Sequence, residues 1–318
     1  MFFSNLRKRI GIYIPSLSAI VLLLILGQIL SPGFASPSNI GNIMAMATVL
    51  AMAAIAQTLI VISGNEGIDL SIGAVMSMGA LLGAVFSQGM NENIWYAVLM
   101  LTVLGIIIGL INGVAIQYIK IPPLVMTLSM ASVVNGFSLA YTKGLPTGSA
   151  PEWLVQLGIG HVGPIRWLLI LGIVLVLIME LILRKTRYGR TLYLVGSNRR
   201  AAILSGINVN LNVILTYVIA GVAGSLGGLI MLGYVGVAQL EMGADYTMLS
   251  VAAVVIGGTL LSGGSGTYLG SALGSIVLIL LTSVLIAVGM PAGIRVLIQG
   301  LILLLILLAY SREPKLRQ

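Results

Sequence analysis

The sequence predicts an all-α polytopic membrane protein with about ten transmembrane helices, organised as a single transmembrane domain over residues 1–318. Of the 318 residues, 58% are hydrophobic and only 8% are charged, and the mean hydropathy is +1.12. Soluble domains carry about a quarter charged residues, so this chain lacks the polar surface that a globule needs in water. Its 40 glycines suit helices that pack closely in lipid. The lipid bilayer is therefore the expected solvent.

Apolar windows and the polar residues between them define the expected spans, since a spanning helix needs about 20 residues. The ten expected spans are 12–31, 43–63, 70–88, 94–118, 123–142, 165–184, 211–232, 247–261, 267–288 and 292–310. The first is expected to be an uncleaved span, because no small-residue cleavage site follows its basic start. The polar stretch 143–164 and the segment 233–246 are predicted to be outside loops, and the polar stretch 184–210 is predicted to be the main cytoplasmic loop.

Lysines and arginines set the expected orientation, because cytoplasmic loops carry an excess of both. Most fall in three clusters: Arg7, Lys8 and Arg9; Arg184, Lys185, Arg187, Arg190, Arg199 and Arg200; and Arg312, Lys315 and Arg317. Placing all three inside requires an even number of spans between them, which the ten spans provide, so both termini are predicted to be cytoplasmic. The net charge of +8 therefore indicates topology. Nucleic acid is not an expected partner, because a phosphate-binding stripe would have to lie on exposed folded surface.

Within the cytoplasmic loop, the sequence predicts a short helix at Arg199–Leu204, with Asn198 as its N-cap. An amphipathic helix exposed there has two explanations. It lies on lipid headgroups, or it docks into a partner.

Two glycine-rich stretches interrupt the helical pattern, and both contain Ser-Gly-x-x-Gly. The predicted structural glycines are Gly64, Gly67 and Gly73 in the first, and Gly257, Gly258, Gly263, Gly264 and Gly266 in the second. Corresponding interruptions in two halves of a chain indicate a transporter built from an internal repeat. The alternative is two unrelated glycine-rich turns.

Polar residues inside the apolar spans are candidates for a solute passage. They are Gln57, Asp69, Ser71, Asn112, Thr127 and Asn135. An acid at membrane depth is costly and tends to face a cavity or a partner, although Asp69 could instead N-cap a helix that opens at Leu70. The other polar residues could contact a hydroxylated solute or bond across helices. Glu180 is expected to pair with Arg184 at i, i+4.

No catalytic machinery is apparent in the sequence. It contains no HExxH, no Walker lysine loop and no paired-carboxylate motif, and it has no cysteine. The chain is therefore predicted not to be an enzyme and to bind no metal or cofactor itself.

Four ordered motifs resemble the permeases of bacterial ATP-binding cassette (ABC) importers for ribose and related sugars. They are the GIDLSIG stretch at 67–73, Asn112-Gly113 followed by IPPLVMTL at 121–128, the stretch from Tyr188 to Val209, and AAVVIGGT at 252–259 followed by SGGSGT at 262–267. There are three departures. Asn135 stands where the family usually has Arg, Gly64-Asn65-Glu66-Gly67 is longer than the usual GG, and Thr247-Met248 follows Tyr246 where many members have an acid. These departures affect the identity of the solute more than the transport class.

The resemblance implies a multi-pass permease of the bacterial inner membrane that takes up a sugar-like solute by alternating access. A separate cytoplasmic ATPase would bind ATP and Mg²⁺, a periplasmic binding protein would deliver solute, and a second permease chain would complete the passage. The family's coupling loop corresponds to 184–210, where the implied coupling residues are Gly189, Arg190, Gly196, Asn198, Arg199, Ala201, Ala202 and Gly206. Gly189, Gly196 and Gly206 would provide the turns around the helix Arg199–Leu204.

Two other classes remain as alternatives. A secondary transporter or channel would share the spans and the breaks, but would need acids or histidines buried in several helices as an ion relay. A membrane enzyme would need the catalytic cluster that this sequence lacks. The sequence leaves open which solute is carried and whether the second chain is an identical copy.

Overall fold

The computed structural model describes residues 11, 13–146 and 148–310. The first and third basic clusters, and with them the predicted position of both termini, lie outside the described residues. Within them the chain is helical nearly throughout, which confirms the all-α class.

A helix occupies each stretch expected to span the membrane. These helices are α2 (Ile14–Leu30), α3 (Pro37–Ile62), α4 (Ile72–Ser87), α5 (Ile94–Val114), α6 (Pro123–Thr142), α8 (Trp167–Lys185), α11 (Val209–Val235), α12 (Tyr246–Ile256), α13 (Tyr268–Ala287) and α14 (Ala292–Tyr310). By length and composition, six of them could cross a membrane: α3, α5 with its flanking turns, α6, α8, α11 and α13. The total of ten spans remains a prediction.

The connections contain further short elements. They are η1 (Asn91–Asn93), the π-helical turn η2 (Ala115–Ile119), α7 (Glu152–Ile159), the hairpin β1 (His161–Val162) and β2 (Ile165–Arg166), α9 (Arg187–Ser197) and α10 (Arg199–Leu204). The element α10 has the bounds that the sequence predicts. The 11-residue helix α9 was not predicted.

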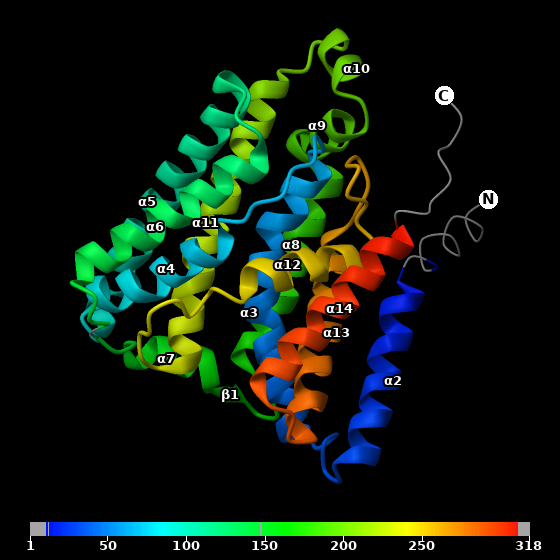
Figure 1. Ribbon diagram of the computed structural model, residues 1–318. Coiled ribbons are helices and arrows are strands. Elements are labelled where there is room, and N and C mark those ends of the chain that lie inside the picture. The colour runs from blue at the N-terminus through cyan, green and yellow to red at the C-terminus, as the bar shows by residue number, and fades with distance from the viewer. Residues whose placement is uncertain (1–10, 12, 147, 311–318) are drawn as a thin grey trace.

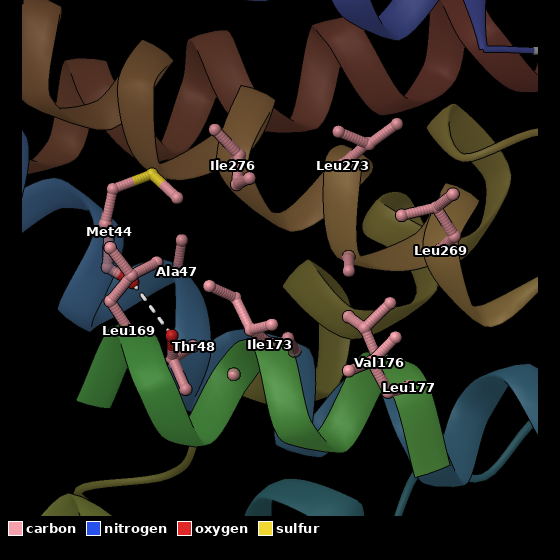
Figure 2. A pocket seen from close by; sticks show the side chains of 13 residues that line it. Met44, Ala47, Thr48, Leu169, Ile173, Val176, Leu177, Leu269, Leu273 and Ile276 are labelled. Atoms are coloured by element: carbon pink, nitrogen blue, oxygen red, sulfur yellow. Dashed lines mark hydrogen bonds between the residues drawn. The ribbon is translucent and has the colours of Figure 1, made fainter. Parts of the chain in front are cut away.

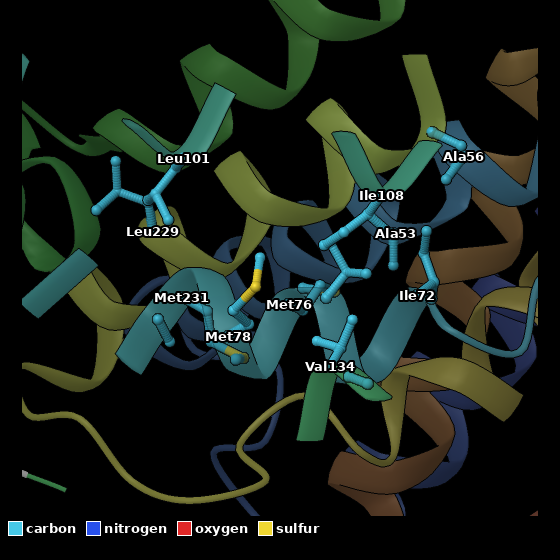
Figure 3. Close-up of a cluster of buried hydrophobic side chains, with 14 of the residues drawn as sticks. Ala53, Ala56, Ile72, Met76, Met78, Leu101, Ile108, Val134, Leu229 and Met231 are labelled. Atoms are coloured by element: carbon cyan, nitrogen blue, oxygen red, sulfur yellow. The ribbon is translucent and has the colours of Figure 1, made fainter. Parts of the chain in front are cut away.

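Helices α3, α4 and α11 form the centre of the bundle, with α5 and α6 on one side and α2, α13 and α14 on the other (Figure 1). Glycines allow α11 to lie directly against its neighbours. A Cβ atom at Gly79 would overlap the Ser225 carbonyl, and one at Gly221 would overlap the Gly105 carbonyl. Between these close approaches, side chains such as Met76, Leu101 and Leu229 fill the core (Figure 3). Packing of this kind replaces the hydrophobic drive that lipid does not supply.

Helices α4 and α12 are short because non-helical backbone precedes each of them. The segment between α11 and α12 ends against the first turns of α4: the Gly243 amide donates to Ser77 Oγ at 2.9 Å, and the Gly73 amide donates to Thr247 Oγ1 at 3.1 Å. Irregular backbone is tolerated within a membrane domain where protein groups satisfy it in this way.

Helices α9 and α10 lie together at the end of the bundle where α3 terminates, at the top of Figure 1. The expectation that Gly189 and Gly196 form turns is wrong, because both lie inside α9. Their missing side chains serve close packing instead, since a Cβ at Gly189 would overlap backbone carbonyls at the end of α8. Gly206 does form a turn, with a left-handed φ of 76°, directly after α10.

Candidate functional site

Five of the six predicted passage residues meet in one buried polar cluster, which we call the polar cluster: Gln57, Asp69, Ser71, Asn112 and Thr127. None is more than 3% exposed. Asp69 Oδ1 accepts hydrogen bonds from the Ser71 amide at 2.7 Å and from Ser71 Oγ at 2.6 Å. Asn112 Nδ2, on α5, donates to Ser71 Oγ at 3.4 Å. The sixth residue, Asn135, lies farther along α6, is half-buried, and is not part of the cluster.

The polar cluster also holds the non-helical backbone between α3 and α4. Gln57 Oε1 accepts from the Asp69 amide at 3.4 Å, and Thr127 Oγ1 accepts from the Leu70 amide at 3.0 Å. The expected helix start at Leu70 is therefore wrong. The Leu70 amide is bonded to α6, α4 begins at Ile72, and Asp69 accepts from Ser71 in the turn before the helix.

Two buried amide atoms in the polar cluster lack a hydrogen-bond partner among the described residues. They are Gln57 Nε2, a donor, and Asn112 Oδ1, an acceptor. The hydrogen bonds distinguish the oxygen from the nitrogen in each side-chain amide, because Gln57 Oε1 accepts from the Asp69 amide and Asn112 Nδ2 donates to Ser71 Oγ. An open donor and an open acceptor are the groups that hydroxyls can bond to, because a hydroxyl can both accept and donate.

The two glycine-rich breaks contact each other, with α9 packed against both. The Gly264 amide donates to the Ile62 carbonyl at 2.9 Å. Gly64 and Gly263 adopt left-handed φ values of 75° and 88°, and a Cβ on either would press on the Gly196 carbonyl oxygen at 2.9–3.0 Å. Gly196 itself lies so close to Ile62 and Gly264 that a Cβ there would overlap their backbone atoms.

The remaining glycines of the two breaks are required for one of two reasons, a positive φ or a close approach of neighbouring backbone. Gly258, Gly264 and Gly266 have left-handed or strongly positive φ values, whereas a Cβ at Gly73 or Gly257 would overlap neighbouring backbone. Gly67 is also buried at a close approach, to the Ile60 carbonyl. The internal repeat remains a prediction. The sequence did not predict the contact between the two breaks.

Side chains of α9 fasten it to the bundle. Tyr193 Oη donates to the Gly266 carbonyl at 2.7 Å, and Tyr188 Oη shares a hydrogen bond of 2.9 Å with Thr216 Oγ1 on α11. Burial, together with the nearby charge of Glu180, raises the pKa of Tyr193 to about 12. The phenol therefore stays protonated and keeps donating to the second break.

Helix α10 presents two different faces. Its N-cap is confirmed, since Asn198 Oδ1 accepts from the Ala201 amide at 2.9 Å. Ala202 is buried, whereas Ile203 is 59% and Leu204 84% exposed. Of the other implied coupling residues, Arg190 and Ala201 are exposed. Arg199 points the other way, toward the bundle, where its guanidinium donates to Gln117 Oε1.

A small crevice separates α10 from the first break. Its walls include Ser63, Asn65, Gln117, Arg199 and Tyr217. Its interior of about 10 Å³ holds no more than one water molecule. The crevice itself is therefore too small for a solute.

Glu180 has a role that the sequence did not indicate. Its expected ion pair with Arg184 is confirmed, with Arg184 Nε 2.5 Å from Glu180 Oε2. In addition, Glu180 Oε1 accepts from the Leu269 amide at 3.0 Å, in the first turn of α13. Glu180 therefore ties α8 to the helix that follows the second break.

A groove elsewhere in the bundle is lined almost entirely by apolar side chains. It measures about 280 Å³ and lies between α3, α8 and α13 (Figure 2). Its one polar side chain, Thr48, already donates to the Met44 carbonyl at 3.0 Å. Such a lining suits hydrocarbon and offers nothing to a hydroxylated solute. Among the described residues, no group of three His, Cys, Asp or Glu side chains could hold a metal ion.

Comparisons with known proteins give a consistent result. A family model described as branched-chain amino acid transport system / permease component matches residues 39–307. The chain is 33% identical over 305 residues to the ribose import permease protein RbsC of Escherichia coli, covering 94% of this chain and 93% of that protein. It is 31% identical over 317 residues to the protein of the same name from Bacillus subtilis, covering 96% and 94%. It is 33% identical over 307 residues to the autoinducer 2 import system permease protein LsrC of Salmonella typhimurium, covering 93% and 85%. No solved structure matches the chain.

Proposed function

The chain belongs to the family of permease components described for branched-chain amino acid transport systems, and it is a transport permease of the bacterial inner membrane. We propose that it forms half of a passage for a sugar-like solute. The relatives named ribose import permeases support a solute rich in hydroxyl groups. The second half of the passage comes from another permease chain. A periplasmic binding protein delivers solute to the loops 143–164 and 233–246.

Energy for uptake comes from a separate cytoplasmic ATPase, which holds ATP and Mg²⁺. The observation that carries this part of the proposal is the exposed apolar end of α10, formed by Ile203 and Leu204. An exposed apolar tip on a basic loop suits insertion into a groove on a partner protein. The lipid-headgroup alternative for this helix would leave unexplained why α9 is packed so tightly behind it.

Movement of α10 reaches the passage through α9. Because α9 contacts both glycine-rich breaks at Gly196, a push on the loop is delivered to the starts of α4 and α13 together. Rigid elements that contact a bistable region transmit such displacements. Alternating access then includes a step in which the crevice beside α10, which is closed in this structure, opens.

The polar cluster forms the wall that contacts solute when the passage opens. Gln57 Nε2 and Asn112 Oδ1 offer one donor and one acceptor without a partner. Solute hydroxyls bind to these two atoms without breaking a hydrogen bond within the protein, because neither atom has a partner among the described residues.

The experiment is affinity purification of the tagged chain from its native membrane, followed by identification of the proteins that accompany it. We expect an ABC ATPase and a second permease chain in comparable amounts. Leu204→Glu should reduce recovery of the ATPase at least roughly tenfold, since burying a charge in an apolar groove is costly. The matched control is Leu145→Glu, a 68% exposed leucine in the loop 143–164, which should leave recovery unchanged.

Two results would contradict the proposal. One is equal ATPase recovery with Leu204→Glu and with Leu145→Glu, which would remove α10 as the docking element. The other is a chain purified alone that still carries ribose into liposomes along an ion gradient, which would make it a secondary transporter.

A further inference from the structure

Arg199 differs from the exposed basic residues of its loop, because its side chain turns toward the bundle. It is the first residue of α10, is half-buried, and lines the crevice opposite Ser63 and Asn65. Its guanidinium donates to Gln117 Oε1, and Gln117 is 2% exposed. The neighbouring Arg200 is exposed.

In the part of the chain that the structure describes, no carboxylate pairs with the positive charge of Arg199. Among the described residues, the ion pair found is the one between Glu180 and Arg184, and no Asp or Glu oxygen lies within 4.0 Å of the Arg199 guanidinium. Burial lowers the pKa of Arg199, in keeping with a partly dehydrated cation. A half-buried charge costs free energy unless it is hydrogen-bonded, so the bond to Gln117 is the contact that stabilises Arg199 in this position.

Gln117 connects this contact to the polar cluster through one continuous element. It lies in the π-helical turn η2, which extends α5 without interruption. Asn112 is on the same helix, little more than one turn earlier, and donates to Ser71 Oγ, which in turn donates to Asp69. π-helical turns recur at functional sites, where they distort a helix locally.

We propose that Arg199 and Gln117 form a latch that holds α10 against the end of α5 and keeps the crevice closed. Both are positioning residues, because they act through the crevice and the polar cluster. When α10 is pulled away from the bundle, Arg199 leaves Gln117, the crevice opens, and α5 is free to shift Asn112. The latch extends the proposed function, in which an ATPase supplies that pull.

The test uses labelling of a cysteine placed inside the crevice. The chain has no cysteine, so Ser63→Cys introduces a single, nearly isosteric thiol at a buried crevice position. In inside-out membrane vesicles, a membrane-impermeant maleimide should label it slowly. Adding Gln117→Ala or Arg199→Gln should raise the labelling rate roughly tenfold, the effect of losing one charge-assisted hydrogen bond. The control Arg200→Gln removes a neighbouring exposed charge and should change nothing.

Two further variants separate a latch from a general loss of packing. Gln117→Glu supplies a carboxylate to Arg199, so labelling should become slower than in the parent and ATP-driven transport should fall. Gln117→Glu combined with Arg199→Gln should label as fast as the single Arg199 variant. Unchanged labelling in Gln117→Ala and Arg199→Gln would overturn the latch, as would equal acceleration by Arg200→Gln.

The first arm requires no ATPase, so its failure is distinguishable from failure of the proposed function. In a second arm, the purified importer with its ATPase is trapped with ATP and vanadate. Faster labelling of Ser63→Cys in the trapped complex supports opening by nucleotide. If the first arm succeeds and trapping has no effect, the latch stands and the ATPase-driven pull on α10 is wrong.

Discussion

The Gly264 amide donates a hydrogen bond of 2.9 Å to the Ile62 carbonyl, joining two glycine-rich breaks that are about two hundred residues apart in the sequence. Gly196 of α9, in the loop 184–210, packs onto this junction. Three glycine-containing segments from different parts of the chain therefore share one point. A displacement of any one of them acts on the other two.

Gly196→Ala should disrupt this junction. Its Cβ would overlap the backbone of Ile62 and Gly264, neither of which can move independently of the breaks. We expect a loss of about 1–3 kcal/mol in the free energy of unfolding, seen as a lower thermal midpoint in detergent, and reduced solute uptake. Gly300→Ala is the control, because nothing lies within 4 Å of its Cβ position and α14 is helical there. Equal midpoints for the two variants would show that the close approach at Gly196 has no energetic role.

Asp69→Ala should weaken both the fold and transport. The Asp69 carboxylate accepts two hydrogen bonds from Ser71, and its removal leaves a buried amide and hydroxyl without that partner. The expected cost is about 1.5–3 kcal/mol, the range for hydrogen bonds to a charged group. Asp69→Asn keeps an acceptor oxygen and should retain part of the stability. Thermal unfolding and uptake of the proposed sugar-like solute, measured side by side, check both variants.

Glu66→Gln provides the comparison for Asp69. Glu66 lies in the same break but is exposed, so its neutralisation should leave both measurements unchanged. Equal losses in the Glu66 and Asp69 variants would indicate that negative charge in the break matters, independent of the Ser71 contacts.

The periodicity of apolar residues was enough to place the main helices. Both boundaries of α6 and the start of α14 agree with prediction, because Pro123 and Pro291 mark where the helical pattern begins. The start of α4 was misplaced because its determinant is not local. The Leu70 amide is bonded by Thr127, which comes from another helix.

Prediction of the candidate site was partial for a similar reason. Polar residues in apolar spans identified the members of the polar cluster, but sequence spacing could not show that α3, α5 and α6 bring them together. Gln117 went unnoticed because it lies at the end of a span, where a polar residue is ordinary. Helix α9 was missed because its polar and basic residues conceal a buried face formed by Gly189, Leu192 and Val195.

Glu180 variants should separate two contacts made by one carboxylate. Glu180→Gln loses the ion pair with Arg184 but keeps an oxygen for the Leu269 amide. Because Arg184 is 45% exposed, that loss should stay below about 1 kcal/mol. Glu180→Ala also removes the acceptor at the start of α13 and should cost about 1 kcal/mol more. Thermal midpoints of the two variants, with Glu152→Ala as an exposed control, check this order. A Glu180→Gln midpoint as low as that of Glu180→Ala would mean that the ion pair, rather than the helix cap, links α8 to α13.

Asn198→Ala should loosen α10 while leaving the bundle intact. Helix α10 has six residues, and short helices depend on their caps because nucleation is costly. Loss of the bond to the Ala201 amide should cost about 1 kcal/mol. Hydrogen exchange over 199–204 should therefore accelerate roughly fivefold, and ATPase recovery should fall by a similar factor. Asn208→Ala removes the equivalent cap from α11, which has 27 residues and is held by packing, so exchange in α10 should not change. If Asn198→Ala accelerates exchange without lowering ATPase recovery, then the ATPase does not require a preformed α10, and the exposed Ile203 and Leu204 would have to bind in another conformation.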